Sequence, residues 1–97
     1  MKIRHIAVVG SGIAGLSAAW LLSRTHRVTL IEADTRPGGH ANTIDCEVHG
    51  ADVTVDTGFI VYNPPAYPNL TALFSRLKVP TVPSNMSFSV SMGGGAY

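Results

Sequence analysis

The sequence has few of the residues on which disulfide frameworks and metal centres depend. Cys46 is the one cysteine among 97 residues, so the chain can form no intramolecular disulfide and has no Cys-x-x-Cys pair. This cysteine usage favours a reduced, cytoplasmic protein in which Cys46 fills a packing position. The four histidines are dispersed and form no cluster with acidic residues at metal-ligand spacing. We therefore expect no metal site.

Charged residues and long apolar runs are also scarce. Charged residues make up 13% of the chain, the net charge is +1, and the seven lysines and arginines are scattered. Nucleic-acid-binding domains carry a basic face or stripe, so we expect no nucleic-acid partner. No apolar run reaches the roughly 18 residues of a transmembrane helix, so we expect no transmembrane segment. No Walker-type lysine follows the first glycines, which disfavours NTP hydrolysis, and no Ser-His-Asp set is present. The sequence assigns no catalytic residue.

The most informative feature that is present is a glycine-rich turn. It follows an apolar run that ends at Val9 and reads Gly10-Ser11-Gly12-Ile13-Ala14-Gly15. In this Gly-x-Gly-x-x-Gly pattern, Gly10 permits a tight turn, Gly12 lets the backbone approach a pyrophosphate, and Gly15 lets a helix pack against the strand. The first amides of that helix would suit phosphate oxygens. The alternative is a glycine turn between an unrelated strand and helix. This alternative does not explain the residues further along the chain.

That context is an acidic residue followed by a double glycine. Glu32 ends the apolar run 28–31 and comes 22 residues after Gly10. At this spacing a carboxylate accepts hydrogen bonds from the ribose of a bound dinucleotide. A lone glutamate at a strand end is otherwise a solvated loop residue, so only the spacing favours the binding role. Gly38-Gly39 then follows Pro37 in a loop over residues 34–40.

The hydrophobic periodicity predicts the remaining elements. Strands over 5–9 and 27–32 with a helix over 13–23 between them form a parallel βαβ unit with a right-handed crossover. Alternating apolar residues predict a β-hairpin with its turn near residues 49–52. The stripe of Leu70, Leu73, Phe74 and Leu77 predicts an amphipathic helix, and alternation over 86–92 predicts a further strand. The fold class is α/β: a Rossmann-like βαβ dinucleotide-binding unit, a β-hairpin, one amphipathic helix and a further strand.

The glycine turn, Glu32-Ala33 and Gly38-Gly39 together resemble the N-terminal signature of flavin-containing amine oxidases and their relatives, which include phytoene desaturases and UDP-galactopyranose mutases. The stretches 56–63 and 67–70 are similar to a bacterial subgroup of predicted FAD- or NAD-binding amine-oxidase-like proteins. The resemblance implies FAD as the cofactor and hydride transfer from a small-molecule substrate to the flavin. It implies these cofactor-binding residues: Gly10, Ser11, Gly12, Ile13, Ala14, Gly15, Glu32, Ala33, Gly38, Gly39, His40, Thr57, Gly58, Phe59 and Ile60.

Two departures from the superfamily pattern affect this interpretation. His40 stands where the superfamily usually has an arginine that contacts phosphate, so His40 positions the loop or faces the flavin instead. Residues 24–27 contain no glycine to cap the first helix, so a non-glycine residue must end it at a modest cost. Gly58 would let the backbone approach a ring system, and an ordinary strand-end turn explains it equally well.

The resembled enzymes are much longer than this chain, so we expect residues 1–97 to be the N-terminal FAD-binding portion of a longer oxidoreductase. The tail 92–97 resembles a hairpin turn cut off before its second strand. A truncated chain would leave the 70–77 stripe exposed and would self-associate. Two alternatives remain open: an NAD(P)-binding dehydrogenase module, and a truncated non-catalytic chain. The alternation over 86–92 leans toward a hydrophobic substrate, although core packing explains it equally.

Overall fold

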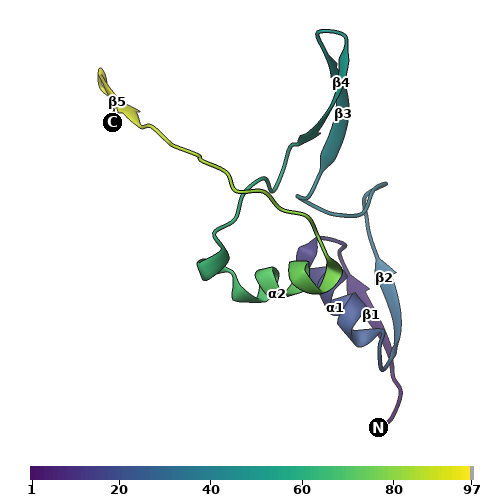
Figure 1. Cartoon of the computed structure of the whole chain (residues 1–97). Coiled ribbons are helices and arrows are strands. Elements are labelled where there is room, and N and C mark those ends of the chain that lie inside the picture. The colour runs from purple at the N-terminus through teal and green to yellow at the C-terminus, as the bar shows by residue number, and fades with distance from the viewer. Residues whose placement is uncertain (97) are drawn as a thin grey trace. The chain divides into compact units, whose positions relative to one another are not determined.

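The computed structural model describes residues 1–96, which divide into two compact units, residues 1–60 and residues 61–96. Each unit is described by itself. The first contains a βαβ unit and a hairpin, and the second contains two short helices and a two-residue strand pair (Figure 1). No helix in the described range is long and apolar enough to cross a membrane.

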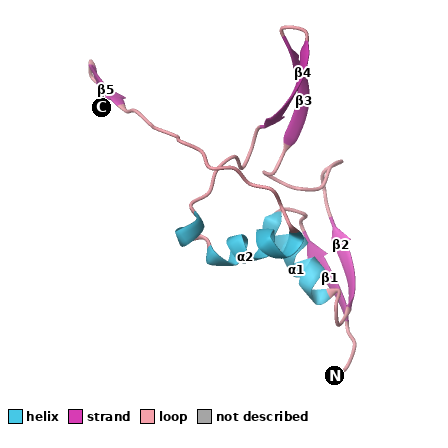
Figure 2. Ribbon diagram, in the orientation of Figure 1, coloured by secondary structure: helices cyan, strands magenta, loops and turns pink. Residues whose placement is uncertain are grey.

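The first unit begins with a parallel βαβ arrangement. Strand β1 (His5–Val9), helix α1 (Ile13–Leu22) and strand β2 (Arg27–Ile31) follow one another, and β1 pairs with β2 in parallel (Figure 2). Their apolar, partly β-branched sequences suit strands of this kind. The backbone N–H of Gly10 donates to the carbonyl of Ile31 at 2.7 Å, which extends the pairing into the turn. The predicted βαβ unit is confirmed, and both strands end at the same edge.

Helix α1 ends without a left-handed residue. Ser23 follows the helix with φ −62° and ψ −17°, and its N–H donates to the carbonyl of Ala19 at 2.9 Å. The N–H of His26 donates to the carbonyl of Leu22 at 2.8 Å. These right-handed turns satisfy the terminal carbonyls, so the expected cost of a non-glycine left-handed cap does not arise.

The hairpin consists of β3 (Thr43–Val48) and β4 (Ala51–Asp56). Its turn is His49-Gly50, with φ of 52° and 79°. Two positive φ values are typical of the two-residue turn that matches the twist of a hairpin. The hairpin is confirmed, although its turn is shorter than the predicted 49–52, because residues 51 and 52 belong to β4.

The register gives the hairpin two different faces. Ile44 pairs with Val55 and Cys46 with Val53 on an apolar face. On the opposite face the hydroxyls of two threonines donate across the strands, Thr43 to Asp56 at 2.6 Å and Thr54 to Asp45 at 2.9 Å. Cys46 is half-buried, so its predicted packing position is only partly covered.

The second unit contains the predicted amphipathic helix. A short 3-10 helix, η1 (Pro64–Ala66), precedes α2 (Pro68–Leu77). Phe74 packs edge-on against Tyr62, with ring centroids 5.3 Å apart. Lys78 ends the helix in the left-handed conformation at φ 56°, and the N–H of Val79 donates back to the carbonyl of Phe74 at 2.9 Å.

The predicted strand over 86–92 is wrong for most of its length. Only Ser91–Met92 forms a strand, β5, which pairs with β6 (Gly95–Ala96) across Gly93-Gly94. Alternation produces a strand only where a neighbour accepts and donates its backbone hydrogen bonds, and residues 86–90 have no such neighbour within the described range. Phe88 is accordingly 89% exposed. The predicted hairpin turn is present and continues into β6, while Tyr97 lies outside the described residues.

Apolar burial is small throughout residues 1–94. Ser11 is the one buried residue of this range, and none of its hydrophobic side chains is buried. Val9 is 79% exposed and Leu21 is 58% exposed. The most enclosed point of the described chain is therefore a hydroxyl in the glycine turn and not an apolar core.

Candidate dinucleotide-binding site

Ser11 joins three segments that are far apart in the sequence. Its backbone N–H donates to Oε2 of Glu32 at 2.8 Å, and its hydroxyl donates to the same oxygen. The N–H of Gly38 donates to the Ser11 carbonyl at 2.9 Å and approaches the Ser11 hydroxyl oxygen at 3.3 Å. The turn between β1 and α1, the residue after β2 and the Gly-Gly loop thus meet at one residue. We call this arrangement the Ser11 junction.

The Glu32 carboxylate is held by hydrogen bonds on both oxygens. Besides the two bonds from Ser11 to Oε2, the N–H of Asp34 donates to Oε1 at 3.0 Å. These bonds, above all the one from the Ser11 hydroxyl, lower the pKa of Glu32 from 4.5 to about 2. Glu32 is therefore ionised at neutral pH. A backbone hydrogen bond from Ala33 also lowers this pKa, and Glu32 remains exposed to solvent.

Gly10 and Gly15 are required by the shape of the turn itself. Gly10 has φ +95°, a conformation that side chains rarely adopt. A Cβ on Gly15 would lie 1.8 Å from the Gly10 carbonyl oxygen. Helix α1 can therefore start this close to β1 only because Gly15 has no side chain.

Gly12 differs, because its open side faces no protein atom. A Cβ built there meets nothing within 4 Å, and Gly12 is the N-cap residue of α1. No side chain caps this helix, and its first turn, which contains Ile13 and Ala14, holds no acidic residue. The helix N-terminus therefore combines free space with uncapped amides, which is the environment that an anion requires.

The Gly-Gly loop lies directly against this turn. Gly38 and Gly39 have φ of +113° and +60°, and a Cβ on Gly39 would stand 3.0 Å from the Cα of Gly12. The guanidinium of Arg36 donates to three carbonyls of the same loop. The predicted cofactor-binding residues do not include Arg36. The available signal was a long cationic donor next to a Pro-Gly-Gly run whose carbonyls have no regular partners.

Three of the remaining site residues form a separate contact at the base of the hairpin. The N–H and the hydroxyl of Thr57 both donate to the carbonyl of Asn42, each at 2.8 Å. A Cβ on Gly58 would lie 1.5 Å from the His40 carbonyl oxygen. Gly58 therefore permits a close approach to the backbone of His40. This contact is a third explanation for the glycine, beside an approach to a ring system and an ordinary strand-end turn.

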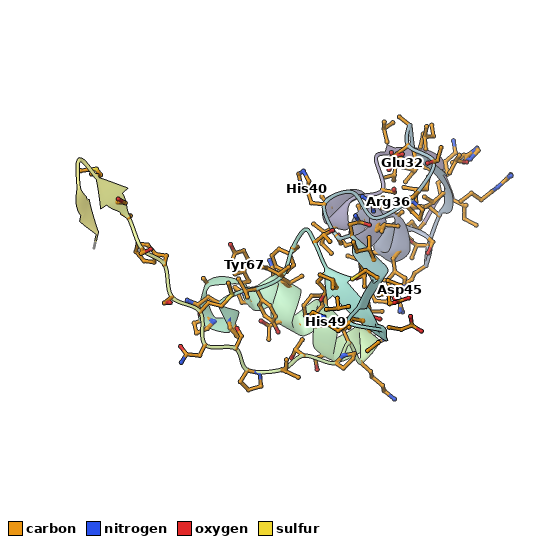
Figure 3. All side chains as sticks on the ribbon, turned by 90° about the horizontal axis from the view of Figure 1, so that it is seen from above. Glu32, Arg36, His40, Asp45, His49 and Tyr67 are labelled. Atoms are coloured by element: carbon orange, nitrogen blue, oxygen red, sulfur yellow. The ribbon has the colours of Figure 1, made fainter. Side chains whose placement is uncertain are left out.

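The remaining side chains of the predicted set are exposed. The His40 side chain is exposed and extends outward from the ribbon (Figure 3). Ala33 is exposed beside Glu32, and Phe59 and Ile60 are 46% and 53% exposed. Within residues 1–96 no group of three or more His, Cys, Asp or Glu side chains could hold a metal ion.

This geometry agrees with a comparison to known families. Residues 8–77, more than half of the chain, match the family model described as an NAD(P)-binding Rossmann-like domain. The chain belongs to this family. The match includes the Ser11 junction, the hairpin and α2.

Relatives of this family member are L-amino-acid oxidases. The enzyme of Bungarus fasciatus is 54% identical over 48 residues, which are 48% of this chain and 9% of the relative. That of Notechis scutatus scutatus is 52% identical over 48 residues, with the same coverage of 48% and 9%. That of Siganus canaliculatus is 52% identical over 40 residues, 40% of this chain and 8% of the relative. The predicted resemblance to amine-oxidase-like flavoproteins is confirmed, while the matched segment spans less than a tenth of each enzyme.

Proposed function

We propose that this chain supplies the pyrophosphate- and ribose-binding part of an FAD site in an amine-oxidase-like flavoprotein oxidoreductase. The observation that carries the proposal is the Ser11 junction. It brings the glycine turn, Glu32 and the Gly-Gly loop together beside an uncapped helix N-terminus. Relatives that are L-amino-acid oxidases support the choice of a flavoprotein.

The residues present fit the diphosphate of such a cofactor. The space beside Gly12 is free of protein atoms for 4 Å around the position of a Cβ. The amides of Ile13 and Ala14 would donate to the phosphate oxygens at the positive end of the α1 dipole. Gly39, which lies against Gly12, would let the second loop pass beside the same group without a side chain in the way.

Glu32 would accept a hydrogen bond from the adenosine ribose. Its carboxylate is ionised and Glu32 is exposed, so a ribose hydroxyl could reach it from solvent. A negative group at this place repels a 2′-phosphate, which disfavours NADP. Thr57, Gly58, Phe59, Ile60 and His40 remain proposed contacts nearer the flavin ring.

When bound, the flavin supplies the redox chemistry as hydride acceptor, and the protein supplies binding, orientation and electrostatics. We propose that the residues described above bind and orient the cofactor. The proposed reaction type is oxidation of an amine-class small molecule, because the relatives are L-amino-acid oxidases. We further propose that the chain functions as the FAD-binding portion of a longer protein in the cytoplasm.

The test uses the protein expressed from the complete reading frame that contains this sequence. Purified protein should carry the visible absorption bands of flavin, and the apoprotein should bind added FAD in preference to NAD and NADP. The family description favours an NAD(P)-binding module as the second candidate. Binding of NAD or NADP with no affinity for FAD would replace the first proposal with the second. A reading frame that ends at residue 97, with a product that binds neither, would indicate the non-catalytic alternative.

A further inference from the structure

We propose that Arg36 is a positioning residue of the dinucleotide site, and this inference rests on the proposed function. Its guanidinium gathers the carbonyls of the Gly-Gly loop and so keeps Gly39 against Gly12. Arg36 itself contacts no ligand in this proposal. It acts through the backbone that would lie beside the pyrophosphate.

The contacts of Arg36 lie inside a single six-residue segment, 36–41. Nη1 donates to the carbonyls of Pro37 at 3.2 Å and of Ala41 at 3.1 Å, and Nη2 donates to that of Gly39 at 2.6 Å. The loop is closed further by the N–H of Ala41, which donates to the Gly38 carbonyl at 3.2 Å. The segment is therefore wrapped around one half-buried cation.

The loop needs such internal hydrogen bonds because of its backbone conformation. Gly38 and Gly39 both have positive φ, and glycine loses more conformational freedom on ordering than any other residue. Outside the segment, the loop is tied to the turn by the N–H of Gly38, which donates to Ser11. Ser11 thus anchors the loop from one side, and Arg36 fixes its internal shape.

The arrangement also has an electrostatic consequence. Carbonyl oxygens carry partial negative charge and repel phosphate, and here three of them are turned toward a permanent cation. Lysine cannot reproduce this, because its one nitrogen cannot reach three carbonyls as two separate guanidinium nitrogens do. We therefore expect position 36 to require arginine and not lysine.

The experiment compares ligands with and without a pyrophosphate. The complete-reading-frame protein and its Arg36→Ala and Arg36→Lys variants are titrated with FAD, ADP and AMP. Arg24→Ala is the matched control, because Arg24 stacks on Trp20 at 4.5 Å and has no contact with the loop. Thermal melts of each protein show whether it is folded.

We expect Arg36→Ala to weaken binding of FAD and ADP by about tenfold, equivalent to about 1.4 kcal/mol, the size expected when a charged donor is lost. Binding of AMP should change by less than about twofold, since AMP has no pyrophosphate beside Gly39. Added methylguanidinium should restore ADP binding to this variant, and methylammonium should not. Arg36→Lys should behave like Arg36→Ala, and Arg24→Ala like the unchanged protein.

Two outcomes overturn the role of Arg36: unchanged ADP binding in Arg36→Ala, or equal losses for ADP and AMP without rescue. If Arg36→Ala fails to fold, the same comparison is made with Arg36→Lys, and equal ADP and AMP losses again overturn the proposal. Failure of the unchanged protein to bind either FAD or ADP overturns the proposed function instead. The two failures are therefore distinguishable.

Discussion

Replacing Gly15 and Gly12 separately with alanine should separate the structural glycine of the turn from the ligand-facing one. In Gly15→Ala the new methyl carbon would stand 1.8 Å from the Gly10 carbonyl oxygen and 2.9 Å from its carbon. Both obstacles are backbone atoms of a turn that already has φ +95° at Gly10, so neither can yield cheaply. Alanine gains roughly 1 kcal/mol from helix propensity. Overpacking costs about 1–3 kcal/mol even where side chains adjust, and backbone adjusts less.

Because the obstacles here are backbone atoms, we place the cost at the upper end of that range, about 3 kcal/mol, so the net loss in the free energy of unfolding is about 2 kcal/mol. Gly12→Ala should change stability by less than about 0.5 kcal/mol, because the gain from a stiffer unfolded chain nearly offsets the poorer N-cap. The Gly12 backbone, at φ −70°, accepts alanine, and its Cβ meets no atom. Its methyl group would instead occupy the place proposed for the pyrophosphate, so FAD binding should be lost.

Urea unfolding followed by far-UV circular dichroism measures the first effect, and FAD titration measures the second. A Gly15→Ala protein as stable as the unchanged one would refute the packing argument. A Gly12→Ala protein that retains FAD affinity would place the pyrophosphate elsewhere. Equal destabilisation by both substitutions would contradict the distinction between the two glycines.

Three further predictions concern single side chains. The lowered pKa of Glu32 means that its ionised form stabilises the folded state above pH 4.5, and this contribution disappears as the pH falls toward 2. Glu32→Gln should therefore lose less stability than the unchanged protein over that acid range, and identical acid unfolding curves would count against the Ser11 bond. Gly58→Ala should loosen the base of the hairpin, because its Cβ would stand 1.5 Å from the His40 carbonyl oxygen. Faster amide hydrogen exchange at Thr57 would measure this loosening, and unchanged protection of that amide would contradict it. Lys78→Gly should stabilise α2 by about 0.5–1 kcal/mol, because glycine relieves the left-handed strain. Thermal melting measures this gain, and an unchanged melting temperature would contradict the prediction.

Local patterns in the sequence were sufficient for most elements of the fold. The two parallel strands and α1 follow from short apolar runs and from the Gly-x-Gly-x-x-Gly motif, which turns the chain from the first strand into the helix. The hairpin and α2 follow from periods of two and of 3.6 residues. The strand over 86–92 failed because alternation describes the side chains alone, whereas a strand also needs a neighbour. The end of α1 is also determined by local residues. The sequence does not decide, however, between a left-handed cap and the right-handed turns that the structure shows.

The site was predictable at the level of its segments and not at the level of its bonds. Spacing connected Glu32 with the glycine turn, but it gave no sign that Ser11 would hold the carboxylate. A serine between two glycines is one of several small residues that such a turn accepts. The bond from Ser11 depends on how closely β1 and β2 end together, which is a tertiary property. Arg36 was missed for the same reason, because its partners are carbonyls of a loop with no periodicity.

The burial of a serine hydroxyl where other domains bury leucine or phenylalanine has a calorimetric consequence. The heat-capacity change of unfolding scales with the apolar surface that becomes hydrated. With no apolar side chain buried in residues 1–94, that change should fall below the usual roughly 12–15 cal/mol/K per residue. Stability would then vary little with temperature. A ligand that binds the folded form would supply a large share of the total by mass action, so the melting temperature should follow ligand concentration closely.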